Sequence, residues 1–179
     1  TVAVFGAGGV GLNVIQGAIL ASASKIIAVD TVEFKLDKAK EMGATDVVNA
    51  SMEEPGPRIA KMTGGGADYA FEVVGWPEIV VQAFESIRPG GTAVMVGLQP
   101  PGSKITIDAW DLLQDRSLIG GFHGSASPRV DFPWLLDLYM DGRLKLDELI
   151  TRYRPLEEIN EAFDDMNNGV TARTVLTFE

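Results

Sequence analysis

Residues 2–11 read VAVFGAGGVG, a short apolar run that leads into the pattern G-x-G-x-x-G at Gly6, Gly8 and Gly11. Residues 12–21, LNVIQGAILA, have the composition of a helix, so the stretch predicts a strand, a tight glycine turn and a helix. In this arrangement the first glycine allows the turn, the second lets a pyrophosphate approach the backbone, and the third lets the helix pack against the strand. The N–H groups and the dipole of the helix start then favour a bound phosphate.

The next apolar run ends in an acid at the spacing of a dinucleotide-binding fold. Residues 26–29, IIAV, have strand character, and Asp30 follows them about 20 residues after Gly11. A carboxylate at this place accepts hydrogen bonds from the adenosine ribose hydroxyls and repels a 2′-phosphate, so we expect NAD in preference to NADP. The alternative is a solvated loop acid that follows an ordinary glycine-rich turn.

The composition is that of a globular domain and argues against several kinds of partner. Among 179 residues, 46% are hydrophobic and 22% charged, and no apolar run approaches the roughly 20 residues of a membrane span. The net charge of −10 disfavours nucleic acid, which would be repelled. The absence of cysteine removes thiolate chemistry and favours a reducing cytoplasm. The first strand starts almost directly after Thr1, so we expect a segment of a longer protein.

Strand and helix patterns alternate through the first two-thirds of the chain. The pattern predicts helices at residues 32–42, 58–62 and 77–87 and strands at residues 46–49, 70–74 and 92–96. After Pro100-Pro101-Gly102 it predicts an exposed edge strand at 104–108, strands at 118–119 and 174–178, and helices at 132–140 and 156–168. Such alternation predicts an α/β fold, a Rossmann-type doubly wound parallel sheet in three α/β/α layers.

Seven segments in order resemble one known family. They are VAVFGAGGVGLNVIQGA (2–18), IIAVD (26–30), KAKEMGATDVVN (38–49), FEVVG (71–75), PGGTAVMVG (89–97), LITRYRPLEEINEAFDDM (149–166) and ARTVLTF (172–178). Together they resemble the coenzyme-binding, C-terminal half of the medium-chain zinc-dependent alcohol dehydrogenases, most of all a class III-like branch. The resemblance implies an NAD-binding Rossmann domain at 1–124. It also implies C-terminal helices and a closing strand at 125–179, which pack against a missing N-terminal catalytic domain.

The resemblance further implies which residues contact the coenzyme. Backbone N–H groups of Gly9 and Val10 meet the pyrophosphate, and the Val10 side chain presses on the nicotinamide; Lys35 reaches the adenosine ribose, and Arg173 the pyrophosphate. Val74 and Trp76 line a slot beside the adenine. Backbone groups at Val96 and Leu98 and near Gly121 and His123 bind the nicotinamide carboxamide. The full expected set is Gly6, Gly8, Gly9, Val10, Gly11, Asp30, Lys35, Val74, Trp76, Val96, Leu98, Gly121, His123 and Arg173.

Several of these residues have simpler interpretations. Val10 is equally compatible with core packing, Lys35 with a surface position on an amphipathic helix, and Trp76 with a half-exposed aromatic under a loop. His123 is the only histidine, which suggests a general base. Its glycine-rich bend and the backbone role of the family position argue against that.

By this resemblance the chain is the NAD(H)-binding domain of a zinc-dependent alcohol or aldehyde oxidoreductase that positions nicotinamide for hydride transfer. With no cysteine and one histidine, the chain lacks the ligands of a catalytic zinc, so zinc and the small alcohol or aldehyde substrate belong to the missing half. We expect neither a catalytic nor a metal-binding residue in this segment. The family pairs its subunits near residues 104–108, so we also expect a homodimer through that edge strand.

Two other functions remain open from the sequence. The first is the cofactor domain of a zinc-free quinone or enoyl reductase, a relative that commonly uses NADPH. The second is a non-catalytic nucleotide-binding module. Cysteine and histidine at family spacing upstream of this segment would favour the zinc enzyme.

Overall fold

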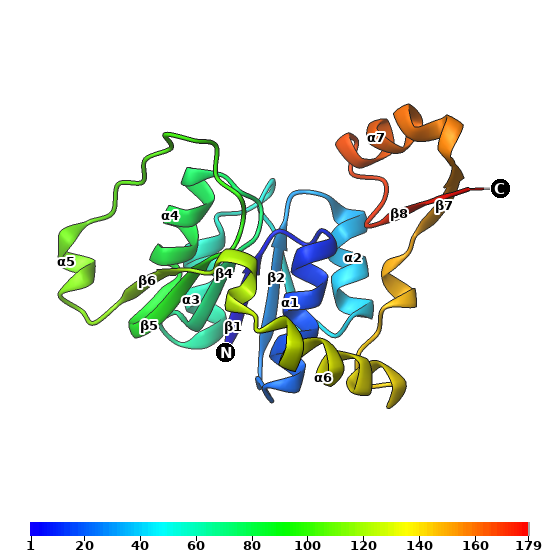
Figure 1. Cartoon of the computed structure of the whole chain (residues 1–179). Coiled ribbons are helices and arrows are strands. Elements are labelled where there is room, and N and C mark those ends of the chain that lie inside the picture. The colour runs from blue at the N-terminus through cyan, green and yellow to red at the C-terminus, as the bar shows by residue number, and fades with distance from the viewer. Residues whose placement is uncertain (179) are drawn as a thin grey trace. The chain divides into compact units, whose positions relative to one another are not determined.

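The computed structural model describes residues 1–178, in two compact units, Thr1–Ala126 and Ser127–Glu179. Figure 1 shows the order of their helices and strands. Within residues 1–178, none of the helices combines the length and the hydropathy that crossing a bilayer would require.

The first unit is built on a six-stranded sheet in the order β3-β2-β1-β4-β5-β6. All neighbouring strands run parallel. The chain builds outward from β1 to β3 and then crosses to β4 on the other side of β1, which confirms the expected doubly wound sheet. The strands are β1 (Val2–Phe5), β2 (Ile26–Asp30), β3 (Asp46–Asn49), β4 (Ala67–Glu72), β5 (Ile87–Met95) and β6 (Ser117–Gly120).

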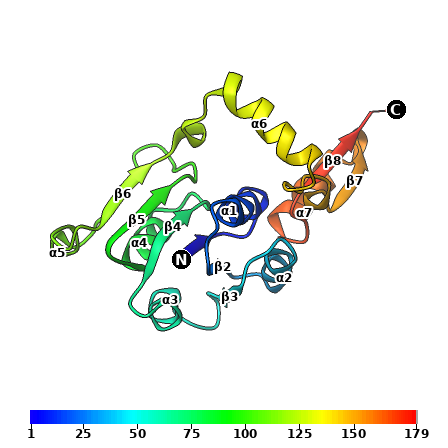
Figure 2. The ribbon, with the colours of Figure 1, turned by 90° about the horizontal axis from the view of Figure 1, so that it is seen from below.

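Helices cover both faces of this sheet, as Figure 2 shows in the view along it. They are α1 (Gly9–Leu20), α2 (Glu33–Glu41), α3 (Pro55–Thr63) and α4 (Pro77–Glu85), with a short α5 (Ala109–Leu112) before β6. Helices α1 and α2 contact each other on one face, and α3 and α4 contact each other on the opposite face. The three expected layers are therefore present.

The core explains why these segments became central strands. Every residue of β1 is buried, because helices cover the sheet on both sides, and the sequence there is a continuous apolar run. Ala3 and Phe5 pack in one cluster with Phe84 of α4 and Ile59 of α3. Complete burial of a side chain such as Phe5 or Phe84 stabilises the fold by about 1.5–3 kcal/mol.

Element boundaries differ from the sequence predictions at several places. Helix α1 begins at Gly9 rather than at Leu12, and α3 covers Pro55–Thr63 rather than only residues 58–62. Strand β5 begins at Ile87, where the pattern predicts the end of a helix. Its first half pairs irregularly, with a register shift between Ala67 and Tyr69 of β4. Local periodicity does not show this pairing, because a partner strand supplies the hydrogen bonds.

Residues 104–108 correct one prediction. The polar–apolar alternation predicts an edge strand, but the structure forms no strand there, and the Asp108 carboxylate instead caps α5 by accepting from the Trp110 N–H at 2.9 Å. Strand β6 lies beside β5 at the end of the sheet, and none of the described strands pairs with residues 104–108. Ile107 packs against the core cluster. The prediction of an edge strand at residues 104–108 is therefore wrong for the single chain.

The second unit contains a small two-stranded parallel sheet between helices. Its elements are α6 (Pro128–Met140), η2 (Asp147–Leu149), β7 (Arg152–Pro155), η3 (Leu156–Glu158), α7 (Ile159–Asn167) and β8 (Thr174–Thr177). The expected closing strand is present as β8, and its partner β7 is missed by the sequence analysis. Arg154 donates to Asp165 at 2.8 Å and, with Arg152, lowers the pKa of that carboxyl. The contribution of this pair to stability is therefore lost as pH falls through the depressed pKa.

Candidate functional site

The carboxyl edge of the sheet collects most of the residues that the sequence singles out. Parallel strands end at the same edge, so residues that directly follow different strands become neighbours there. The sheet order reverses between β1 and β4, and open α/β sheets bind ligands at such a point. The expected residues at this edge are Gly6 and Gly8 after β1, Asp30 at the end of β2, Val74 and Trp76 after β4, Val96 and Leu98 after β5, and Gly121 and His123 after β6.

The turn between β1 and α1 is held by glycines at two crowded positions. Gly6 has φ +102° and donates its N–H to the Val29 carbonyl of β2 at 2.8 Å. A Cβ on Gly6 would lie 2.7 Å from the Val74 side chain, and a Cβ on Gly11 would lie 1.8 Å from the Gly6 carbonyl oxygen. Glycine is therefore required by the protein itself at both positions, as the motif predicts.

Gly8 differs from these two because, apart from its chain neighbours, no atom of the described residues lies within 4 Å of where its Cβ would be. It is the N-cap of α1, and the first intrahelical hydrogen bond runs from Leu12 N–H to its carbonyl at 2.9 Å. No side chain of the described residues caps α1, and its first turn carries no acid. The N–H groups of Gly9 and Val10 thus face an opening at a helix N-terminus, an arrangement that favours an anion.

Asp30 joins the end of β2 to the glycine turn. Its Oδ2 accepts from the Ala7 N–H at 2.8 Å, and its Oδ1 accepts from the N–H groups of Thr31 at 2.8 Å and Val32 at 3.0 Å. The residue is half-buried, with three backbone partners, rather than a freely solvated acid. A carboxylate offers about four acceptor positions, so one remains for a hydroxyl donor.

Apolar side chains are exposed around this edge. Val10 is 54% exposed, so core packing does not account for it, and Trp76 and Leu98 are 59% and 84% exposed. Val74 is also exposed, and Val96 is half-buried beyond the end of β5. Flat or apolar parts of a ligand would find partners among these side chains.

The remaining expected residues lie in different surroundings. Lys35 is half-buried on α2 and forms no ion pair within residues 1–178. Gly121 donates its N–H to the Met95 carbonyl at 2.9 Å, which ties the end of β6 to the end of β5. His123 is exposed with φ +50°, and its ring lies edge-on to Phe122 with centroids 4.2 Å apart. Arg173 is exposed in the second unit, directly before β8, and its role stays a prediction.

The sequence analysis missed Glu72, the last residue of β4. It is 1% exposed, and its Oε1 accepts from the N–H groups of Val74 at 2.7 Å and Gly75 at 2.5 Å. The signal that could have identified it is an acid within the apolar run AFEVV at residues 70–74, because a buried charge requires partners.

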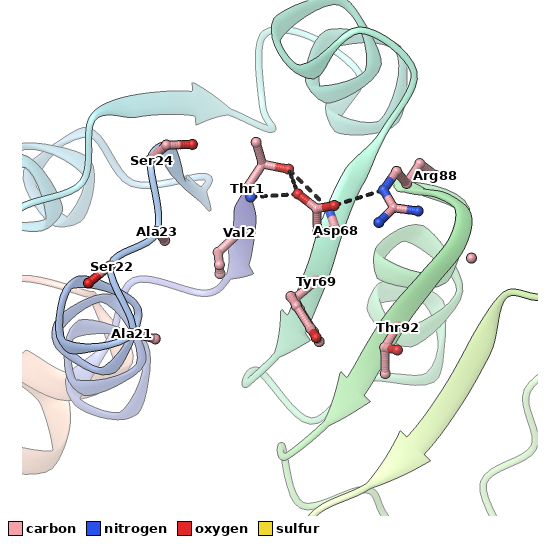
Figure 3. A pocket seen from close by; sticks show the side chains of 11 residues that line it. Thr1, Val2, Ala21, Ser22, Ala23, Ser24, Asp68, Tyr69, Arg88 and Thr92 are labelled. Carbon is pink, nitrogen blue, oxygen red and sulfur yellow. Dashed lines mark hydrogen bonds and ion pairs between the residues drawn. The ribbon is translucent and has the colours of Figure 1, made fainter.

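A pocket of about 430 Å³ lies away from these residues, at the amino ends of the strands (Figure 3). Asp68 at its wall accepts from the Thr1 hydroxyl at 2.7 Å and from Arg88 at 2.7 Å. None of the expected coenzyme residues lines this pocket, and its carboxylate is already paired, so we do not assign the site here.

Metal ligands do not converge in the part of the chain that the structure describes. Across residues 1–178 there is no group of three or more His, Cys, Asp or Glu side chains arranged to hold a metal ion. A catalytic zinc takes three protein ligands and keeps one position open, so these residues do not fit one.

The fold and the edge just described define a Rossmann-type α/β protein with a glycine turn and a paired acid at its switch point. The pattern of the family described as zinc-binding dehydrogenase matches residues 9–141. The chain belongs to this family, which confirms the resemblance seen in the sequence.

Individual relatives agree with this placement. The chain is 41% identical to alcohol dehydrogenase-like 5 of Arabidopsis thaliana, over 98% of this chain and 46% of the relative. It is 42% identical to the NDMA-dependent alcohol dehydrogenase of Amycolatopsis methanolica, over 98% of this chain and 48% of that protein. The crystal structure of benzyl alcohol dehydrogenase from Acinetobacter calcoaceticus superposes with a TM-score of 0.95 at 35% identity, covering 100% of this chain and 49% of that one. The chain thus spans about half the length of these relatives.

Proposed function

We propose that this chain is the NAD(H)-binding domain of a zinc-dependent alcohol or aldehyde oxidoreductase. One observation carries the proposal: the Asp30 carboxylate, 2.8 Å from the Ala7 N–H, lies directly beside an open helix N-terminus. N–H donors for a phosphate and a carboxylate acceptor for the ribose hydroxyls are thereby adjacent, as binding a dinucleotide requires. The membership in the zinc-binding dehydrogenase family supports the same function.

Each residue of the edge has a task in this proposal. Gly8, Gly9 and Val10 hold the pyrophosphate at the start of α1, with Gly6 and Gly11 shaping the turn. Asp30 and Lys35 hold the adenosine ribose. The adenine lies beside Val74 and Trp76, the nicotinamide beside Val10, Val96, Leu98, Gly121 and His123, and Arg173 reaches the pyrophosphate.

The chemistry is divided between this chain and other groups. Bound NAD supplies the hydride acceptor, and NADH the donor, while this chain binds and orients the coenzyme. Because residues 1–178 do not fit a zinc ion, we derive no step through zinc here. Zinc, and the small alcohol or aldehyde, belong in the proposal to an N-terminal catalytic domain outside this chain.

The second part of the chain has a packing role in this proposal. Residues 125–179, apart from Arg173, pack against the missing catalytic half, whereas residues 1–124 form the coenzyme-binding domain. Phe163 and Met166 are exposed on α7 beside a mainly apolar pocket of about 300 Å³, and this supports a covered surface. A cytoplasmic location, expected from the lack of cysteine, is part of the same proposal.

A homodimer is also part of the proposal. Residues 104–108 form no strand in the single chain, and a second copy would supply the partner strand that is lacking. The exposed side chains of Trp110, Leu113 and Ile119 nearby in sequence give such an interface apolar area.

Coenzyme titration tests the proposed function. We expect the 179-residue chain to bind NADH at least about tenfold more tightly than NADPH, because Asp30 repels a 2′-phosphate. Fluorescence titration of both coenzymes measures the ratio of the two dissociation constants.

An activity assay tests the division of tasks. The same chain with added zinc should oxidise no alcohol, since the zinc ligands are elsewhere. Equal or tighter binding of NADPH would favour the quinone or enoyl reductase, and zinc-dependent alcohol oxidation by this chain would refute the division of tasks.

Replacing Gly8 with Ala separates binding from folding. Apart from the chain neighbours, no atom of the described residues lies within 4 Å of the new methyl group, and φ at this residue is −79°. The free energy of unfolding should therefore change by less than about 0.5 kcal/mol. The methyl group would occupy the path of the pyrophosphate, so NADH affinity should fall at least about tenfold. Gly17→Ala on the exposed side of α1 is the control and should bind NADH normally. Unchanged affinity of Gly8→Ala would place the pyrophosphate elsewhere.

A further inference from the structure

Glu72 is a buried carboxylate for which the proposed function has no use. It ends β4 in register with Phe5 of β1 and Met95 of β5, close to the switch point of the sheet. The side chain is 1% exposed. A charge this deeply buried is costly unless hydrogen bonds compensate it, so its partners show what it does.

Those partners come from the turns that follow two neighbouring strands. Besides the N–H groups of Val74 and Gly75 after β4, the carboxylate accepts from Gln99 Nε2 after β5 at 3.2 Å. The same Gln99 amide lies 3.3 Å from the Gly97 carbonyl. The main-chain carbonyl of Glu72 accepts from Val96 N–H at 2.9 Å and from Gly97 N–H at 3.0 Å. One residue therefore joins both turns.

The two turns also lie in direct backbone contact. A Cβ on Gly97 would lie 2.3 Å from the Gly75 nitrogen and 2.8 Å from Oε2 of Glu72, and a Cβ on Gly75 would lie 2.6 Å from the Leu98 carbonyl oxygen. Neither turn has room to move toward the other. A change in the hydrogen bonds of Glu72 must therefore displace both turns together.

We propose that Glu72 is a positioning residue for the coenzyme. Its carboxylate fixes the turns that carry Val74 and Trp76 on one side and Val96 and Leu98 on the other. These are the walls assigned to the adenine and the nicotinamide, so the inference rests on the proposed function. Glu72 itself touches neither, because it is buried beneath the turns.

The test replaces Glu72 with Gln, a side chain of nearly the same size. The amide keeps one acceptor oxygen, but its NH₂ group must then face either the two backbone N–H groups or the Gln99 NH₂ group, so a donor loses its partner. We expect the dissociation constant of NADH to rise about three- to tenfold. Glu78→Gln makes the same chemical change at an exposed position in the first turn of α4 and should leave NADH binding unaltered.

Two further measurements separate positioning from stability. Titrations are made well below the unfolding temperature of each variant, because a purely stabilising residue would change that temperature and not the affinity. Amide hydrogen exchange should accelerate at Val74 and Gly75 while Val4 in β1 stays protected.

In the double variant Glu72→Gln/Gln99→Glu, the amide of residue 72 again finds an acceptor at residue 99. Part of the NADH affinity that Glu72→Gln loses should therefore return.

The outcomes distinguish the two proposals. If the unsubstituted chain fails to bind NADH, the proposed function is wrong. If the unsubstituted chain binds NADH and Glu72→Gln binds it equally well, the positioning role alone is overturned. Weakened binding in Glu72→Gln, faster exchange at the two turn amides and recovery in the double variant together support it.

Discussion

Gly11→Ala is expected to destabilise the chain by about 3 kcal/mol or more, enough to unfold much of a marginally stable domain. The new Cβ would lie 1.8 Å from the Gly6 carbonyl oxygen and 2.9 Å from its carbon. Relief would require α1 to move away from β1, although Leu12 and Ile15 of that helix are completely buried. Chemical denaturation followed by circular dichroism measures the loss.

Gly17→Ala is the matched control, because it lies on the same helix and, apart from the adjacent backbone of that helix, no atom of the described residues lies within 4 Å of its Cβ position. It should stabilise the chain by about 0.5–1 kcal/mol, since alanine restricts the unfolded backbone and favours helix. Equal stabilities of the two variants would contradict the close approach of α1 to the glycine turn.

Asp30→Ala is expected to have the largest effect on coenzyme binding. It removes the ribose acceptor and also the acceptor of the Ala7, Thr31 and Val32 N–H groups. Hydrogen bonds to a charged group contribute about 1.5–3 kcal/mol, so NADH affinity should fall about 10- to 100-fold. Binding of NADPH should suffer less, because the repulsion of its 2′-phosphate disappears with the carboxylate. Calorimetric titration of both coenzymes measures the change in preference.

Asp37→Ala provides the control for charge on the neighbouring helix. Asp37 is exposed on α2 and pairs with Lys40 at 3.2 Å, so its removal should cost less than about 0.5 kcal/mol and leave coenzyme preference intact. Asp30→Asn separates the two tasks of Asp30, because the amide oxygen still accepts from backbone N–H groups without the negative charge. Retained discrimination against NADPH in Asp30→Ala would show that another group reads the 2′ position.

Local chemistry made much of the first unit predictable from the sequence. The apolar run at 2–5 is continuous because helices bury both faces of β1, and Gly6 and Gly11 are required by a positive φ and a close backbone approach. These constraints act on single residues, so they are visible in the pattern. The alternation of strands and helices then leaves a doubly wound sheet as the expected topology.

Predictions failed where a distant partner decides the local structure. Residues 104–108 have the alternation of a strand but form none, because no described strand pairs with them. Strand β7 shows no convincing pattern, yet it forms because β8 is available to pair with it. A strand needs hydrogen bonds from another segment, and the sequence of one segment does not state whether that partner is free.

By itself, the sequence determined the fold class, the glycine turn, the place of Asp30 and the family. The tertiary structure alone decided which groups those residues meet. It placed the Ala7 N–H on the Asp30 carboxylate, left Val10 exposed rather than packed in the core, and enclosed Glu72 between the turns after β4 and β5. The reason is physical: backbone N–H groups carry no residue identity, so their pairing with a carboxylate is fixed only when parallel strands bring their ends to one edge.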